Sequence, residues 1–316
     1  MTLAAVLLLG LGALLAEPVP LLLARAGWPQ RAPRPALVLW QAVGLAAGVA
    51  AIGAGVLYGV APLAGSVPAG VWALAVQAGP GSPFAGLGWP HLLALLAAAV
   101  LAGRLLGVLL TSTARTLRDR HRHRTMVDLL GTPWPDLGGA RVLAHPDAVA
   151  YCLPGLRARV VLSAGTLRLL NAEELAGVLA HERAHVSERH DLVVLPFVAW
   201  GAALPFVRGV RRAQAAVASL VEMVADDRAR MVADPGALAS AIARVGSVGA
   251  PRGALAAGGP AGPAGLGGAG DSVVLARVTR LLDPPPPVPR WLPVAVYVGA
   301  ALLILLPALP LLLPGS

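Results

Sequence analysis

The sequence predicts a mainly α-helical membrane protein, in which four transmembrane helices accompany a cytoplasmic α+β domain. Of the 316 residues, 57% are hydrophobic and only 13% are charged, whereas soluble domains carry about 25% charged residues. Four stretches are apolar over the roughly 20 residues that a helix needs to cross a bilayer core. The long region between the third and the fourth stretch is more polar and shows the patterns of both strands and helices.

The four predicted spans cover residues 3–24, 36–60, 92–110 and 291–313. Their orientation follows from the arginines, which make up all 25 basic residues. Three arginines lie between the first two spans, an arginine-rich run at 115–124 follows the third, and 65–90 has no charged residue. Because basic loops stay in the cytoplasm, we expect both chain ends outside and residues 111–290 inside the cell. The same rule explains the net charge of +9 without nucleic acid, whose binding requires a basic stripe on one folded face.

These spans divide the chain into three transmembrane helices (1–112), a cytoplasmic domain (113–290) and a fourth transmembrane helix (291–316). Cys152 is the only cysteine, so no internal disulfide is possible. Glu17 in the first span and Arg104 in the third leave two alternatives open: they pair, because charges inside a bilayer are costly and often pair, or Arg104 extends toward the lipid headgroups.

Short strands are predicted early in the cytoplasmic domain, at residues 142–144, 149–153 and 158–163, with Pro154-Gly155 as a turn between the last two. Asn171 with Glu174 three positions later predicts a capped helix from 172 to about 189. A second helix is expected from about 210 to 232.

Three further segments complete the domain. Residues 192–207 are apolar but too short to cross a bilayer, and should form a hairpin-like or peripheral segment. Residues 249–270, rich in Gly, Ala and Pro, are expected to be a flexible linker. Asp271 is a candidate cap for a last short helix.

The most informative motif is the sequence HERAH at residues 181–185. Residues four positions apart share a helix face, so His181 and His185 can bind one metal ion. Glu182 can then address a water molecule that the metal activates, take its proton and pass it to a leaving amine. This arrangement predicts a zinc site that hydrolyses peptide bonds.

A third ligand is available on the second predicted helix, where Glu222 and Asp226 also lie four positions apart. Glu222 can complete a site of two histidines and one glutamate with an open position for water. Asp226 can accept a hydrogen bond from the free ring nitrogen of a histidine ligand.

Other polar residues have weaker signals. His190 and Asp191, expected at the end of the first helix, are interpreted as capping or pairing residues in preference to ligands. Arg228, Arg230 and Arg277 are candidates for stabilising an oxyanion, and the sequence does not rank them.

Three stretches together resemble the gluzincin membrane metallopeptidases: HERAH at 181–185, EMVAD at 222–226, and YCLPG at 151–155 followed by VVLS at 160–163. The chain looks most like the BlaR/MecR-type antirepressor peptidases, whose zinc domain lies between the third and fourth spans. It is also similar to the HtpX and CAAX-prenyl type of membrane endopeptidase. The resemblance implies a zincin-like domain with zinc ligands His181, His185 and Glu222 and with Glu182 as the catalytic residue. Since the chain stops soon after its last span, we expect no β-lactam-sensing domain.

We therefore expect an integral membrane zinc metalloendopeptidase whose partners are a protein or peptide substrate and the lipid bilayer, with no direct binding of nucleic acid. Cleavage of a repressor is the first hypothesis. A quality-control protease, or a catalytically silent receptor that binds a partner through its zinc domain, is the alternative. An extended substrate would pair with an exposed strand, for which we predict Val149, Ala150 and Tyr151.

Overall fold

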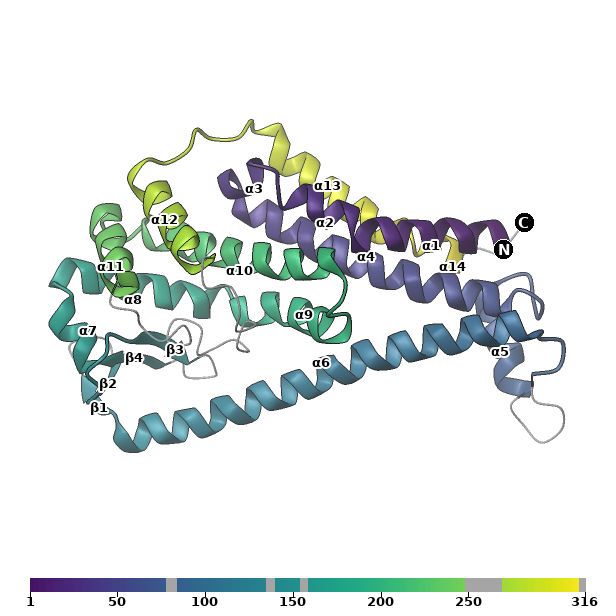
Figure 1. Cartoon of the computed structure of the whole chain (residues 1–316), viewed down its shortest axis with the longest axis horizontal. Helices are drawn as coiled ribbons and strands as arrows, with labels where there is room; N and C mark the ends of the chain where they lie inside the picture. Colours follow the sequence, from purple (N-terminus) through teal and green to yellow (C-terminus); the bar gives the residue numbers. More distant parts are fainter. Residues whose placement is uncertain (78–83, 135–139, 154–158, 248–268, 313–316) are drawn as a thin grey trace. The chain divides into compact units, whose positions relative to one another are not determined.

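The structure is a computed structural model that describes residues 1–77, 84–134, 140–153, 159–247 and 269–312. Helices make up most of the described chain and a small sheet completes it (Figure 1). The chain forms two compact units. The first comprises Met1–Leu109, Ala199–Ala216 and Val288–Ser316, and the second comprises Leu110–Val198 and Val217–Pro287. Residues 199–216 belong with the first unit by these contacts, which the sequence did not indicate, and the division into transmembrane helices and a cytoplasmic domain stays a prediction.

Four helical stretches of the described chain are long and apolar enough to cross a membrane: Thr2–Leu23, Pro33–Val60, Trp89–Leu130 and Trp291–Leu312. Each contains one of the predicted spans almost entirely. The first consists of α1 (Thr2–Ala16) and α2 (Pro18–Leu23), which are separated at Glu17. This break has a local cause, because Pro18 disfavours helical backbone at the residue before it.

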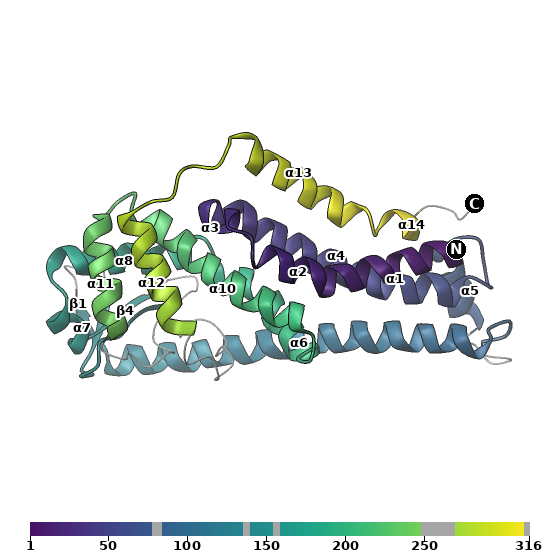
Figure 2. The same ribbon diagram turned by 45° about the horizontal axis from the view of Figure 1, so that its top comes forward.

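Helix α4 (Pro33–Val60) is the centre of the first unit, with α1 lying along it (Figure 2). Helix α13 (Trp291–Leu305) also contacts α4. The short helices α3 (Trp28–Arg31), α5 (Val67–Gln77) and α14 (Leu309–Leu312) complete the unit. Small residues permit close helix contacts, since a Cβ atom at Gly55 would lie 2.8 Å from the carbonyl oxygen of Ala94. Arg104 does not pair with Glu17 in the described part of the chain. Its Nε donates instead to the carbonyl oxygen of Ala203, 2.7 Å away, because the last turn of α9 leaves that oxygen without a helical partner.

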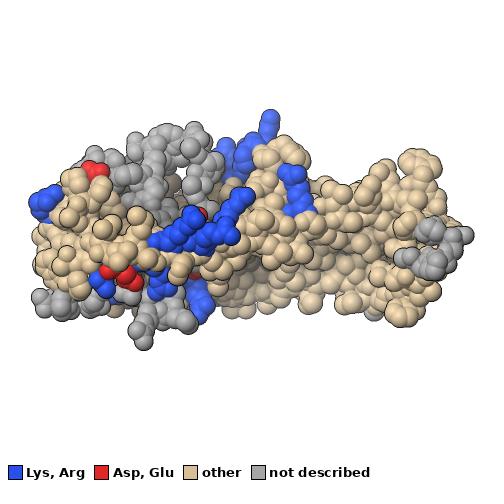
Figure 3. Space-filling model, turned by 90° about the horizontal axis from the view of Figure 1, so that it is seen from below, with Lys and Arg blue, Asp and Glu red and all other residues tan. Residues whose placement is uncertain are grey.

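Helix α6 (Trp89–Leu130) has 42 residues and continues well beyond the predicted span. Its exposed side chains change along its length from apolar ones, such as Leu96, Val100 and Leu106, to the basic Arg115 and Arg118. The face shown in Figure 3 displays the same contrast, with arginines gathered over one stretch and a long tan stretch without charge. Arginine is a good helix former, so the basic run extends the helix and does not end it.

A four-stranded sheet begins the second unit, with strands β1 (Thr132–Trp134), β2 (Ala140–Leu143), β3 (Ala150–Leu153) and β4 (Arg159–Ser163). The order is β1-β2-β4-β3, in which β2 and β4 are parallel and the other pairs antiparallel. The predicted strands correspond to β2, β3 and β4, whereas β1 was not predicted. The predicted turn at Pro154-Gly155 lies outside the described residues, as does nearly all of the predicted linker.

Helices α7 (Ala164–Leu169), α8 (Ala172–Ser187), α11 (Pro235–Ser247) and α12 (Ala269–Leu282) follow the sheet in the second unit. The predicted capping box on α8 is confirmed. Glu174 N–H donates to Asn171 Oδ1 at 2.9 Å, and Asn171 N–H donates to Glu174 Oε2 at 3.0 Å. Val178 and Leu179 of α8 pack against Ala150 and Leu162 of the sheet. Asp271 lies inside α12 and not before it.

Helices α9 (His190–Ala203) and α10 (Arg208–Ala229) form a helical hairpin whose tip belongs to the first unit. The tip is tight, because a Cβ atom at Gly201 would lie 2.5 Å from Gln214 Oε1. The apolar segment 192–207 thus turns back as a hairpin. Because the chain turns back at this tip, the second half of α10 belongs to the second unit together with α8. A metal site with ligands from α8 and α10 requires both helices in one unit.

Candidate metal centre

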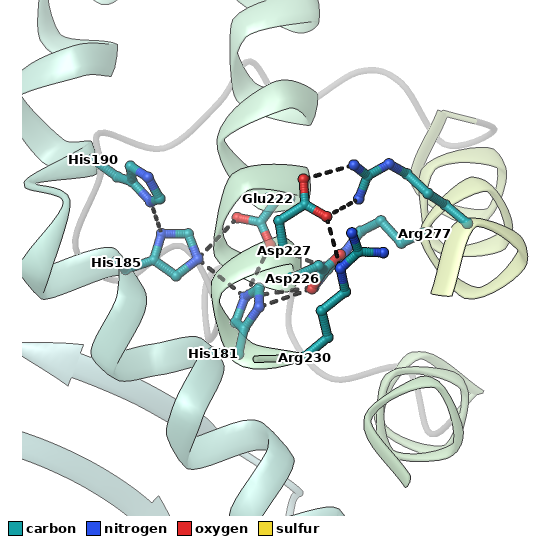
Figure 4. A network of polar contacts seen from close by, with 9 residues as sticks. His181, His185, His190, Glu222, Asp226, Asp227, Arg230 and Arg277 are labelled. Atoms are coloured by element: carbon teal, nitrogen blue, oxygen red, sulfur yellow. Dashed lines mark hydrogen bonds and ion pairs between the residues drawn. The ribbon is translucent and has the colours of Figure 1, made fainter. Parts of the chain in front are cut away.

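Three potential ligands converge in the second unit from two helices. His181 and His185 lie one turn apart on α8, and Glu222 lies on α10. Their potential ligand atoms all lie within 4.8 Å of one another, close enough to share one metal ion. Figure 4 shows the two imidazole rings turned toward the Glu222 carboxylate. The structure thus brings together the three residues predicted to bind metal.

The spacing of these atoms fits a zinc ion. His181 Nε2 lies 3.0 Å from His185 Nε2 and 3.4 Å from Glu222 Oε2, and His185 Nε2 lies 3.5 Å from Glu222 Oε1. Ligands at bond lengths of about 2.0–2.1 Å in a tetrahedral zinc site are about 3.3 Å apart. Two imidazole nitrogens and one carboxylate oxygen are also a donor set that zinc accepts, with the fourth position left for water or substrate.

Asp226, one turn after Glu222 on α10, lies next to His181, where its predicted role as a support for that histidine would place it. Its Oδ1 lies 2.9 Å from His181 Nδ1, on the ring edge opposite Nε2. Asp226 itself is only 1% exposed and is held by Arg277, whose Nε and Nη2 donate to its two carboxylate oxygens at 2.8 and 2.7 Å. A carboxylate in this place fixes the orientation of the ring and makes its other nitrogen a better ligand.

Arg277 of α12 contacts three members of the site: Asp226, Glu222 and, through Nη2 at 3.5 Å, Nε2 of His181. Besides its two bonds to Asp226, its Nη1 lies 2.9 Å from Glu222 Oε2. The side chain is buried, and such a bidentate arginine pair is among the strongest hydrogen-bonded ion pairs in proteins. Of the three arginines that the sequence could not rank, Arg277 alone has a described contact with the ligand group. Arg228 points to Met231, and Arg230 lies 3.4 Å from Asp227.

Charge and burial oppose each other in this cluster. Burial lowers the pKa of His181, but the Asp226 and Glu222 carboxylates outweigh it and raise that pKa to about 9. Burial is decisive for His185, whose pKa falls to about 3 even though Glu222 opposes the shift. Burial alone would raise the pKa of Glu222, yet Arg277 and His181 hold it well below its usual range. Glu222 therefore keeps the negative charge that a ligand needs.

Glu182 is buried on α8 and has only 2% of its surface exposed. It directly follows His181 and lies outside the ligand group. Burial lowers the pKa of Arg277, but three carboxylates outweigh burial and raise that pKa. Glu222 and Asp226 contribute most, and Glu182 contributes as well.

The predicted substrate strand is the last strand of the described sheet. In the antiparallel pair of β3 and β4, Val149 faces Ser163, Ala150 faces Leu162 and Tyr151 faces Val161. Ser163 N–H donates to Val149 O at 2.8 Å, which marks this as a hydrogen-bonded pair. Because such pairs alternate, Tyr151 directs its backbone groups to β4 and Ala150 directs its own away from it.

Val149 and Tyr151 are engaged within the fold. Val149 N–H donates to Ser163 Oγ, and its carbonyl also accepts from Thr166 Oγ1. The Tyr151 side chain is buried in a cluster with Val127 and bonds to His123 of α6. Of the three predicted residues, Ala150 therefore has the backbone groups that face the edge.

Two features of the site had no clear signal in the sequence. The first is the pairing of α12 with α10: Arg280 binds Asp227 through two bonds of 2.7 Å, next to the Arg277–Asp226 pair. The available clue was the spacing of two arginines on the mostly apolar stretch 273–282, which matches two adjacent aspartates on α10. The second is His190, which begins α9 and does not end α8, and whose Nδ1 lies 2.9 Å from His185 Nδ1.

Comparison with known proteins agrees with this site. Residues 117–247 match the family model for peptidase family M48, and this segment contains α8 and α10 with all three potential ligands. Arg277 lies beyond it. No curated protein and no solved structure gave a match. The family match covers less than half of the chain, and together with the grouping of His181, His185 and Glu222 it indicates a metallopeptidase site within residues 117–247.

Proposed function

We propose that this protein is an integral membrane metalloendopeptidase that uses zinc to hydrolyse peptide bonds of cytoplasmic or membrane-proximal proteins. The observation that carries the proposal is the convergence of His181, His185 and Glu222 to zinc-ligand spacing beside the buried Glu182. The M48 match supports the reaction class. The four long apolar helices and the arginine-rich continuation of α6 support the membrane location.

The residues of the chain have separate tasks in this reaction. Zinc, when bound, supplies a Lewis acid that acidifies a water molecule and polarises the peptide carbonyl. Glu182 accepts the proton of the attacking water and returns it to the amine that leaves. Asp226 keeps the His181 ring oriented, and Arg277 holds both Asp226 and the Glu222 carboxylate in place.

The substrate chain is proposed to add to the sheet at β3. Ala150 N–H and C=O face the edge, so they can pair with the backbone of an extended peptide of any sequence. The adjacent α8 carries the metal ligands and packs against β3. Cleavage of a repressor is the physiological role that the BlaR/MecR resemblance favours, and quality-control proteolysis is its rival.

The experiment is turnover of an unstructured protein, such as casein, by the full-length chain in detergent. Hydrolysis should require zinc, stop on addition of a chelator and return when zinc is restored. Glu182→Gln should abolish it, whereas Glu173→Gln, a matched change at an exposed position in the first turn of α8, should not. A chain that binds zinc but never cleaves, even with zinc in excess, would instead be the silent receptor.

Substrate trapping identifies the role. Glu182→Gln expressed in its native membranes should retain uncut substrate, which cross-linking and mass spectrometry can identify. Recovery of a repressor supports regulatory cleavage, and recovery of many unrelated damaged membrane proteins supports quality control.

A further inference from the structure

The two histidines at the metal centre are supported by different groups. Nδ1 of His181 faces the Asp226 carboxylate at 2.9 Å. Among the described residues, Nδ1 of His185 contacts no carboxylate and lies 2.9 Å from Nδ1 of His190. The His185 and His190 rings meet edge to face with centroids 4.8 Å apart (Figure 4). His190 is only 4% exposed, so this contact is enclosed within the second unit.

The backbone between α8 and α9 places His190 there. Helix α8 ends at Ser187, and Arg189 adopts a left-handed conformation with φ of 49°. Leu192 N–H then bonds to Arg189 O, which starts α9. This sharp change of direction brings the first residue of α9 behind the last ligand of α8.

The geometry excludes His190 from the ligand set as described. Nε2 of His185 points to His181 and Glu222, whereas His190 lies at the opposite ring nitrogen. A neutral imidazole carries one N–H, and a ligand nitrogen must present its lone pair. When His185 binds metal through Nε2, its Nδ1 carries the hydrogen and donates it to His190 Nδ1.

We infer that His190 is a positioning residue for zinc binding, which accepts a hydrogen bond from His185 Nδ1–H and so holds His185 in the tautomer and orientation that present Nε2 to the metal. The inference rests on the proposed zinc site. It assigns His190 the role for His185 that Asp226 has for His181, with a neutral acceptor in place of a charged one. Groups that hold metal-binding histidines in this way typically contribute a factor of about 10–100 in metal affinity.

Two substitutions separate this role from packing. In His190→Asn the side-chain oxygen takes nearly the place of Nδ1, so an acceptor remains. His190→Leu fills a similar volume without an acceptor. His145→Leu makes the same change at an exposed loop residue and is the control. Zinc affinity is measured on the full chain in detergent by competition with a chromophoric chelator, and the absorption spectrum of the cobalt-substituted protein reports ligand geometry.

His190→Leu should bind zinc about 10–100-fold more weakly and change the cobalt spectrum, while His190→Asn and the control stay within about threefold of the parent. Circular dichroism checks that each variant is folded. Parent-like affinity and spectrum in His190→Leu would overturn the inference, as would an equal loss in His190→Asn, which would assign the effect to packing. If the parent protein binds zinc and cleaves, and His190→Leu has the same zinc affinity, only the inference about His190 fails. If the parent protein binds no zinc, the proposed function fails together with this inference.

Discussion

Replacing Asp226 with Asn tests how the site holds its first ligand. The change keeps the size of the side chain and one carbonyl-type oxygen, but it removes the negative charge that faces His181 Nδ1 at 2.9 Å. It also ends the bidentate pairing with Arg277. The guanidinium is then left with Glu222 as its remaining carboxylate partner at 2.9 Å, and it competes more strongly with metal for that oxygen.

The expected loss of zinc affinity is about 10–100-fold, which corresponds to about 1.4–2.8 kcal/mol at tenfold per 1.4 kcal/mol. Folding also suffers, because the side chains of Asp226 and Arg277 are only 1% and 6% exposed. Breaking a buried ion pair by removing one partner costs about 3–5 kcal/mol. The affinity must therefore be measured at a temperature at which the variant remains folded.

The neighbouring residue provides a matched control. Asp227 also forms a bidentate pair between α10 and α12, through bonds of 2.7 Å to Arg280, but it contacts neither histidine nor Glu222 in the described network. Asp227→Asn should lower the thermal unfolding temperature and leave the zinc dissociation constant within about threefold. Competition with a chromophoric chelator measures both variants. Equal losses of affinity in the two would refute the reasoning, because the effect would then arise from docking of α12 and not from His181.

Four further outcomes are expected. Glu182→Gln should retain zinc by metal analysis and lose peptide hydrolysis, and retained hydrolysis would contradict its role as base. A chelator should stop turnover, with recovery on adding zinc but not magnesium, since the nitrogen ligands suit zinc. Ala150→Pro removes one N–H at the sheet edge, where proline is tolerated, and should raise KM several-fold without loss of zinc. Ala150→Ser keeps the N–H and should leave KM unchanged. Equal KM values in the two variants would place the substrate elsewhere. The topology is tested in a chain whose Cys152 is replaced by Ser. A cysteine introduced at Ser66 should react with an impermeant thiol reagent on intact cells, whereas one introduced at Arg168 should not. The reverse pattern would invert the topology.

The site was predictable where its geometry is local. Two histidines four positions apart, or Glu222 and Asp226 at the same spacing, share a helix face whatever the rest of the fold does. The cap at Asn171 likewise depends only on the four residues that form it. The structure agrees at all these positions, and it turns the two helix faces toward each other.

The parts that could not be predicted depend on contacts distant in sequence or on an unusual backbone. Arg277 reaches the site from a helix that no motif connects to α8 or α10. His190 was expected to end a helix, because nothing in the sequence, such as Gly or Asn, indicates the left-handed Arg189 that starts a new one. Strand β1 has three residues with Pro133 at its centre, which is unfavourable for a strand and is compatible here with an edge position.

The position of Arg277 near the end of the chain has a consequence for how the protein acquires metal. The three ligands lie within residues 181–222, on helices joined by one hairpin, so they can assemble from local contacts while the chain is still being made. Until α12 is synthesised, Glu222 and Asp226 lack the guanidinium that later binds both. During that interval no guanidinium from α12 offsets the negative charge of the two carboxylates. A metal ion that binds then meets no competing arginine at the Glu222 oxygen that Arg277 later contacts at 2.9 Å.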